Sequence, residues 1–299
     1  MMNRARTRGI DHFGLTVGSL EDAIHDLSNA LGAGLCYIEG PIRDPEPGWM
    51  AAKLGARGSC TLRVAALNVL GTNLELFDYT GAEHRSWTSP AGTAGTFFLL
   101  LRTRAPERVI SRLFYEDAVV RRAEHPAPGY QVTLPSGIHL AIQHGSEEQL
   151  LSAVCLNRYD HHRAITELTG AFGLREVDAV SAFGASGIVL AGDHGAPLAV
   201  LHGRSPAPRP ANSDLGGHHV AFHADDIDAS LASLPAATRY VPRGAPETIT
   251  EGPIAGDRWI YLDSPFGLQL ELINMPDGSL PYETGASARR TPITIGAFA

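Results

Sequence analysis

The sequence predicts an α+β protein made of four βαβββ units, two in each half of the chain. Three observations support this prediction. An apolar strand, a polar turn and a short amphipathic helix occur together four times; each copy continues through alternating, strand-like segments; and each copy closes with a glycine turn and a last apolar strand. The chain of 299 residues is long enough for two domains of ordinary size.

The spacing of apolar residues defines the first half of each unit. Strands are predicted at 10–17, 96–103, 152–157 and 218–224, and helices at 19–32, 106–114, 161–173 and 226–234. In the first helix Ser19 is a suitable N-cap and Gly32 a suitable stop. One face of this helix is apolar and consists of Leu20, Ala23, Ile24, Leu27 and Leu31.

The second half of each unit ends in a turn and a final strand, at 71–79, 135–143, 195–203 and 264–274. A glycine precedes each final strand, as hairpin turns require: Gly71, Gly137, Gly195 and Gly267. The polar stretch HGSEEQ lies between the second and third units. We therefore predict a first domain at residues 1–146 (units 8–80 and 94–145), a second at 147–276 (units 150–203 and 215–275), and a C-terminal tail at 277–299.

Composition limits the classes of function. The net charge of −8 argues against a nucleic-acid or anionic-membrane partner, since both need a basic surface. No stretch approaches the roughly 20 apolar residues of a membrane span, and the N-terminus lacks the apolar run of a secretory signal. Three widely spaced cysteines fit reduced thiols. We expect a cytoplasmic protein, a monomer or a homodimer, that acts on a small molecule.

Alignment of the four units reveals polar residues at matching places in the outer two units. The first strands offer His12, Phe98, Ala153 and His219, in that order of units. The closing strands offer Glu75, Ala141, Ala199 and Glu271. Side chains that can bind a metal therefore occupy both positions in units one and four, and neither position in units two and three.

The four polar residues indicate a metal site. Strand alternation places each of them on the face opposite the apolar stripe of its strand. A glutamate inside a mostly apolar strand is costly unless it is paired, solvated or bound to a metal. Two imidazoles and two carboxylates suit one divalent ion such as Ni, Co, Zn, Mn or Fe, which would polarise a substrate oxygen as a Lewis acid. We predict the ligands His12, Glu75, His219 and Glu271, with Glu271 or Glu75 as general base.

These residues resemble those of the vicinal oxygen chelate superfamily, which includes glyoxalase I, methylmalonyl-CoA epimerase, fosfomycin- and bleomycin-resistance proteins and extradiol dioxygenases. The resemblance rests on IDHFGLTVGSLEDAI with NLELFDY, and on HHVAFHADDIDA with GPIAGDRWIYLDSPFGLQLELIN. It implies two cupped mixed sheets with helices on the outer faces, in which unit one pairs with unit four and unit two with unit three. It also implies one metal-binding cup and one metal-free cup. The ligand set is similar to that of bacterial glyoxalase I.

Six further side chains are predicted to line a substrate pocket. His223 shares a strand face with His219, Gln269 shares one with Glu271, and Phe77 shares one with Glu75. Trp259 and Tyr261 alternate on the strand before the final hairpin, and Trp49 lies in a loop-to-helix segment that would cover the cup. His218 precedes the ligand position and is expected to face away.

The leading hypothesis is a metal-dependent isomerase, epimerase or lyase that moves a proton next to a chelated carbonyl or enediolate. A metal-free binding protein, such as one that sequesters an antibiotic, is the alternative. An Fe(II) extradiol-type dioxygenase and a thiol transferase are further alternatives, and Ala153 argues against the dioxygenase because ring-cleaving relatives have a histidine there.

Overall fold

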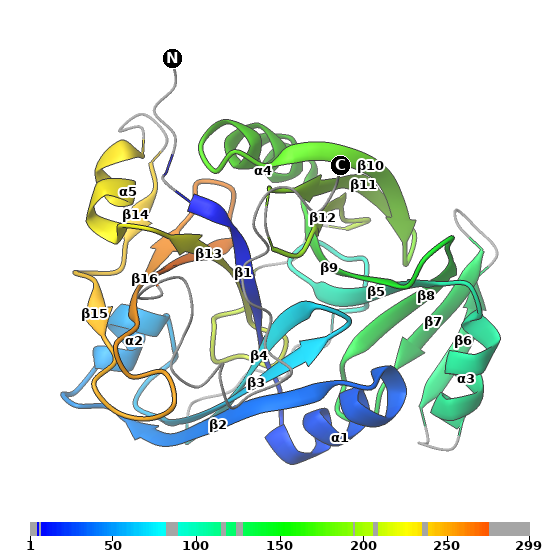
Figure 1. Cartoon of the computed structure of the whole chain (residues 1–299), viewed down its shortest axis with the longest axis horizontal. Helices are drawn as coiled ribbons and strands as arrows, with labels where there is room; N and C mark the ends of the chain where they lie inside the picture. The colour runs from blue at the N-terminus through cyan, green and yellow to red at the C-terminus, as the bar shows by residue number, and fades with distance from the viewer. Residues whose placement is uncertain are drawn as a thin grey trace.

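The computed structural model describes residues 5, 7–81, 89–114, 118–123, 128–193, 195–205, 209–234 and 239–274. Its helices are α1 (Leu20–Leu31), α2 (Trp49–Leu54), α3 (Pro106–Phe114), α4 (Arg158–Gly170) and α5 (Ile227–Ser233). The strands form two mixed sheets, and the helices lie at the periphery (Figure 1). No helix of these described segments is long and apolar enough to cross a membrane. The predicted tail at 277–299 falls outside the described residues.

The first sheet combines units one and four, and we call it the outer-unit sheet. Its order is β14-β16-β17-β13-β1-β4-β3-β2, with β15 paired to β16. Unit one supplies β1 (Thr7–Thr16), β2 (Gly34–Arg43), β3 (Thr61–Val69) and β4 (Thr72–Thr80). Unit four supplies β13 (His218–Ala224), β14 (Val241–Pro242), β15 (Glu247–Thr248), β16 (Arg258–Asp263) and β17 (Gln269–Asn274).

The second sheet combines units two and three, and we call it the inner-unit sheet. Its order is β10-β11-β12-β9-β5-β8-β7-β6. Unit two supplies β5 (Phe97–Thr103), β6 (Val119–Ala123), β7 (Gly129–Thr133) and β8 (His139–His144). Unit three supplies β9 (Gln149–Leu156), β10 (Arg175–Ala182), β11 (Ala185–Ala191) and β12 (Leu198–His202).

The predicted fold class and the predicted pairing of units are both confirmed. β1 pairs with β13 and β5 with β9, each antiparallel, so the first strands of paired units meet at the middle of each sheet. Each sheet thus draws strands from both halves of the chain. The predicted boundary at 146/147 divides the chain by repeat units and stays a prediction.

Helix ends follow local sequence signals. Ser19 accepts a hydrogen bond from the Asp22 N–H at the start of α1, and Gly32 ends this helix with a left-handed conformation of φ 69°, as predicted. The third predicted helix begins earlier than expected, at Arg158 in place of His161, because the Asn157 side chain caps it by accepting from two backbone N–H groups.

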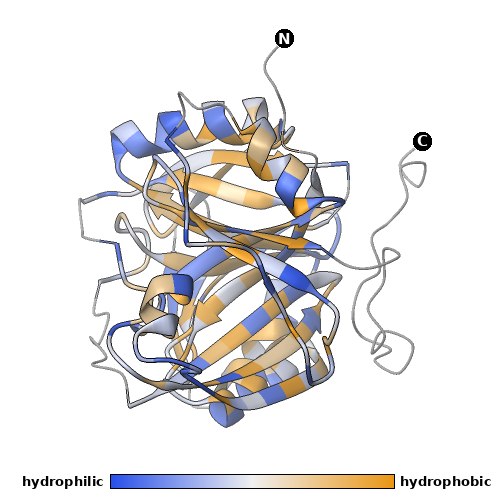
Figure 2. Cartoon of the chain, turned by 90° about the vertical axis from the view of Figure 1, so that its left-hand side faces the viewer, coloured by the Kyte–Doolittle hydropathy of each residue, from blue (hydrophilic) through white to orange (hydrophobic). Residues whose placement is uncertain are grey.

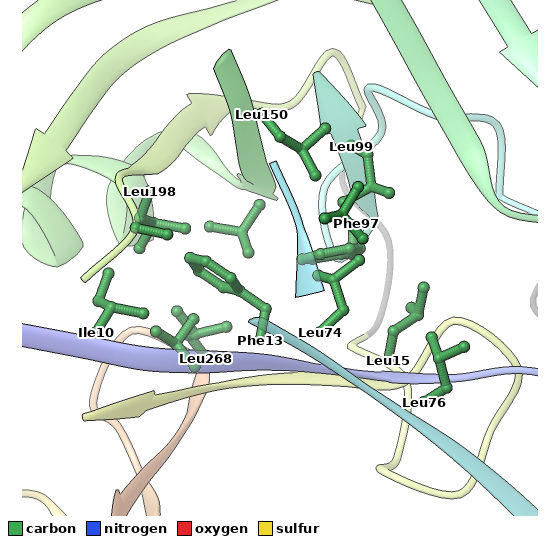
Figure 3. Close-up of a cluster of buried hydrophobic side chains, with 14 of the residues drawn as sticks. Ile10, Phe13, Leu15, Leu74, Leu76, Phe97, Leu99, Leu150, Leu198 and Leu268 are labelled. Carbon is green, nitrogen blue, oxygen red and sulfur yellow. The ribbon is translucent and has the colours of Figure 1, made fainter. Parts of the chain in front are cut away.

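One large apolar core fills the space between the two sheets. Phe13 and Leu15 of β1 and Leu74 of β4 meet Phe97 and Leu99 of β5 there (Figure 3). Side chains from α1, α3 and α4 join the same cluster, and hydrophilic and hydrophobic segments alternate along the helices (Figure 2). The opposite face of each sheet is therefore the one available for a site.

Candidate metal centre

Four neighbouring strands hold the four predicted ligand residues. The order β17-β13-β1-β4 places side by side, one on each strand, Glu271, His219, His12 and Glu75. The two histidines lie on the central antiparallel pair, and each glutamate lies on a strand parallel to its neighbour. Alternation along the strands directs all four away from the core between the sheets.

The ligand-competent atoms of these residues lie close together. His12 Nε2 is 3.4 Å from Glu75 Oε2, 3.3 Å from Glu271 Oε2 and 3.4 Å from His219 Nε2. His219 Nε2 is 3.2 Å from Glu271 Oε2. All four side chains are buried. The structure thus brings every predicted ligand residue into one cluster, and their role as ligands stays a prediction.

A bulge in β1 supports His12. The pairing with β13 shifts between Ile10 and His12, which leaves Asp11 as the extra residue. Asp11 Oδ2 lies 2.8 Å from His12 Nδ1 and fixes the orientation of the imidazole. A carboxylate on Nδ1 leaves Nε2 as the atom that faces the cluster, which is the usual arrangement for a histidine that binds a metal.

Gly14 makes room for the second histidine. It lies opposite His219 in the β1–β13 register, and a Cβ added to it would be 1.8 Å from His219 Cε1. Any larger residue would therefore push the imidazole out of the cluster. The sequence contained this glycine, but it gave no sign that a ring from the fourth unit fills the space.

Two tyrosines complete the polar surroundings. Tyr37 donates a hydrogen bond of 2.7 Å to Glu75 Oε1, and the Tyr261 hydroxyl lies 3.4 Å from His219 Nε2. Sequence analysis placed Tyr261 in the pocket and missed both Tyr37 and Asp11. Asp11 could have been noticed because it precedes a candidate ligand, whereas Tyr37 belongs to a strand whose place in the sheet was unknown.

The electrostatics of the cluster couple its members. Burial alone lowers the pKa of His12, but Glu75, Asp11 and Glu271 together raise this pKa well above its usual value. Burial lowers the pKa of His219. Burial also raises the pKa of Glu271, yet the two adjacent imidazoles outweigh it and bring this pKa to about 2. Without an ion the cluster therefore combines an ionised Glu271 carboxylate with a protonated His12 imidazole.

The residues present fit a divalent ion. Metal bonds of roughly 2.0–2.2 Å imply ligand–ligand separations of about 3 Å in an octahedron and about 3.4 Å in a tetrahedron, close to the separations found here. Ligand atoms of His12, His219 and Glu271 all lie within 4.8 Å of one another, and Glu75 adds a fourth. Glu271 Oε2 is buried and forms no hydrogen bond, although both imidazoles are near. Such an oxygen suits a metal ligand.

A cavity of about 680 Å³ opens beside the cluster, within the usual size range of sites for small molecules. Its wall includes Glu75 and Glu271 and four of the predicted pocket residues: Trp49, Phe77, Trp259 and Tyr261. α2 and the segment around Ile249 form its sides.

The other two predicted pocket residues lie elsewhere. Gln269 is buried. Its amide donates a hydrogen bond to the Leu54 carbonyl and accepts one from Arg209, so this side chain connects α2 to the sheet. His223 lies near the end of β13, opposite Gly9 and beside Ile273, and is not part of the cavity wall. His218 faces away as predicted; it packs on Phe97 of the inner-unit sheet.

Glu39 is a further acidic residue in the cavity wall that sequence analysis missed. Burial, followed by the charge of Glu75, raises the pKa of Glu39 to about 7. It lies on β2, at the edge of the sheet and three strands from β1, yet it lines the same cavity as Glu75 and Glu271.

Comparison with known proteins agrees with this fold. No family model matches the chain. A 2-epi-5-epi-valiolone epimerase from an Actinomyces species is 54% identical over 80 residues, which are 27% of this chain and 43% of that protein. The match therefore spans less than half the length of this curated relative.

Solved structures of glyoxalase I from Zea mays are similar over most of the chain. The wild-type enzyme has a TM-score of 0.59 at 12% identity, and the match covers 89% of this chain and 92% of that one. A variant of the same enzyme gives 0.62 with the same identity and coverage. The chain therefore has the fold of glyoxalase I, as the resemblance in its sequence implied.

Proposed function

We propose that the protein is a metal-dependent epimerase that moves a proton next to a carbonyl group of a small hydroxyketone. The main support is the convergence of two imidazoles and two carboxylates from four strands beside a cavity of suitable size. The similarity of an 80-residue segment to an epimerase supports the same class of reaction.

A divalent ion held by His12, His219, Glu271 and Glu75 would supply a Lewis acid that lowers the pKa of the C–H next to the bound carbonyl. The chain itself supplies the groups that move the proton. Glu75 and Glu271 both reach the cavity, from strands on opposite sides of the histidine pair. If one carboxylate removes the proton and the other returns a proton to the opposite face, the configuration at that carbon is inverted.

Of the two carboxylates, Glu75 is the better candidate for the first proton transfer. Glu271 Oε2 lies within 3.3 Å of both imidazoles, whereas Glu75 Oε2 lies 3.4 Å from that of His12, and Tyr37 donates a hydrogen bond to the other oxygen of Glu75. The less tightly held carboxylate is the one that can release a ligand position and act as base. Tyr37 would keep it directed at the substrate.

The test is deuterium incorporation from D₂O into 2-epi-5-epi-valiolone, the ketone in the name of the relative. We expect about one divalent ion per chain, exchange that stops with a chelator, and a loss of about 10³-fold or more in Glu75→Gln with the ion retained. Protein that binds the ketone without an ion and without exchange would contradict the proposal and favour a binding protein.

An oxygenase is the second candidate, because His12, His219 and Glu271 alone form the two-histidine, one-carboxylate set typical of non-haem Fe(II) enzymes. Glu75, 3.4 Å from His12, would occupy a position that oxygen or substrate needs in such enzymes. Oxygen uptake with catechols by the iron-loaded protein would favour this alternative over epimerisation.

A further inference from the structure

The charges around the cavity are almost all negative. Its described wall contains five glutamates and one cationic side chain, the exposed Arg43. Glu75 and Glu271 belong to the candidate metal centre, where their two charges would balance a divalent ion. Glu247 is 2.5 Å from Lys53 and is neutralised by it. Two acidic side chains, Glu39 and Glu251, remain to face a ligand.

These two glutamates come from different segments of the cavity wall. Glu39 lies on β2, and Glu251 lies in the segment between β15 and β16. The two segments are in contact, since a Cβ added to Gly252 would come within 2.6 Å of Glu39 Oε1. Neither carboxylate has a lysine or arginine as ion-pair partner within the described segments.

An aromatic wall faces the interior of the same cavity. The ring centroids of Trp49 and Trp259 are 6.1 Å apart, those of Trp259 and Tyr261 are 5.4 Å apart, and those of Tyr261 and His219 are 4.9 Å apart. The series runs from α2 to a predicted metal ligand. Flat aromatic surfaces next to hydrogen-bond acceptors suit a ring with an apolar C–H face and polar hydroxyl edges.

We propose that the substrate is an uncharged, polyhydroxylated ring ketone, and that Glu39 and Glu251 reject anionic derivatives of it. The hydroxyl groups donate to the two carboxylates while the ring packs on the aromatic wall. A phosphate monoester, a coenzyme A thioester or a glutathione adduct would bring further negative charge to them, and Arg43 is the one cationic side chain in the described wall to offset it. This inference rests on the proposed function and names its substrate class.

Calorimetry at pH 8.5, above the pKa of about 7 of Glu39, on the ion-loaded, full-length protein with 2-epi-5-epi-valiolone and with its phosphate monoester tests the inference. We expect the neutral ketone to bind at least about tenfold more tightly, since like charges in contact are strongly unfavourable. The double variant Glu39→Gln/Glu251→Gln should reduce this preference to about threefold or less. High salt should reduce it as well, because screening weakens the repulsion at the edge of the cavity. Glu176→Gln, at an exposed position on β10 of the other sheet, is the matched control and should leave the preference unchanged.

Three outcomes would overturn the inference: an ester that binds as tightly as the ketone, a preference that the double variant leaves unchanged, or a protein that binds neither compound. Failure of the proposed function looks different. In that case the ketone binds and is preferred, but no deuterium enters it from D₂O.

Discussion

The outer-unit and inner-unit sheets share one topology and differ in what fills their concave faces. In the outer-unit sheet the matched positions hold His12, Glu75, His219 and Glu271, which converge beside a cavity. In the inner-unit sheet they hold Phe98, Ala141, Ala153 and Ala199. These four are fully buried in one apolar cluster, and Phe98 packs against Phe183 with ring centroids 4.8 Å apart.

The difference shows that the strand framework does not depend on which side chains its concave faces display. Phe98 of β5 lies directly opposite Ala153 of β9, whereas in the β1–β13 pair His12 lies opposite Ala221 and His219 lies opposite Gly14. One concave face is closed by apolar packing, and the other is kept polar at an energetic cost. We therefore expect the inner-unit sheet to serve stability and the outer-unit sheet to serve chemistry.

The largest effect is expected from removal of a histidine from the polar face. His219→Ala should reduce the bound ion from about one per chain to a small fraction and should lower proton exchange about 10³-fold, because a ligand is lost. His144→Ala, at an exposed position on β8 of the inner-unit sheet, is the control and should keep both. Unchanged metal content by mass spectrometry in His219→Ala would show that the cluster is not the metal site.

The complementary experiment removes a buried aromatic side chain from the apolar face of the inner-unit sheet. Phe98→Ala should lower the free energy of unfolding by about 3–5 kcal/mol, since a fully buried ring leaves a cavity. Folded protein should still bind the ion with wild-type affinity. Denaturant titration and metal analysis of the same sample check both statements. A folded variant that loses the ion would contradict the view that the inner-unit sheet serves stability and the outer-unit sheet serves chemistry.

Gly14→Ala tests whether close packing positions His219. The added methyl group would overlap the imidazole at 1.8 Å, so we expect ion affinity to fall about 10–100-fold while the sheet still forms. Gly18→Ala is the matched control, since its nearest contact would be Leu215 at 3.8 Å. Equal ion affinities in the two variants would show that His219 can shift without loss of the site.

The last effect concerns the pH dependence of stability at the interface between the sheets. Burial lowers the pKa of His218 from 6.5 to about 4. Above pH 6.5 this imidazole is neutral in the folded and unfolded states. As the pH falls towards 4 only the unfolded state takes up the proton, so the free energy of unfolding falls by about 3 kcal/mol from this residue. The asparagine in His218→Asn cannot ionise. In chelator-treated protein, the free energy of unfolding of this variant should therefore decline less steeply between pH 6.5 and 4 than that of the wild type. Identical slopes would assign the acid sensitivity to other groups.

Much of the architecture could be predicted from periodicity. The Ser19 cap, the Gly32 stop and the glycines before the final strands are local signals, and the structure places helices and turns there. The start of α4 was predicted three residues late, because the capping side chain of Asn157 was not recognised. The four candidate ligand residues could be selected because a polar residue in an apolar strand is visible in the sequence itself.

What surrounds those ligands could not be predicted, because it depends on distances between residues far apart in the chain. Tyr37 and Glu39 reach the site from β2, whose position at the edge of the sheet no local pattern specifies. Gln269 shares a strand face with Glu271, yet contacts with Leu54 and Arg209 engage its side chain. Strand alternation predicts the face of the sheet on which a side chain lies, but it does not predict which neighbouring side chains it contacts there.

By itself, the sequence determined the four repeated units and the identity of the two units with polar strand positions, because apolar periodicity and residue type are properties of the linear chain. Only the tertiary structure decided that His12 and His219 face each other across Gly14. It also decided that Glu39 and Glu251, from different segments, both line the cavity. These relations arise from pairing and curvature of strands that are distant in sequence, and such contacts form only when the whole sheet is assembled.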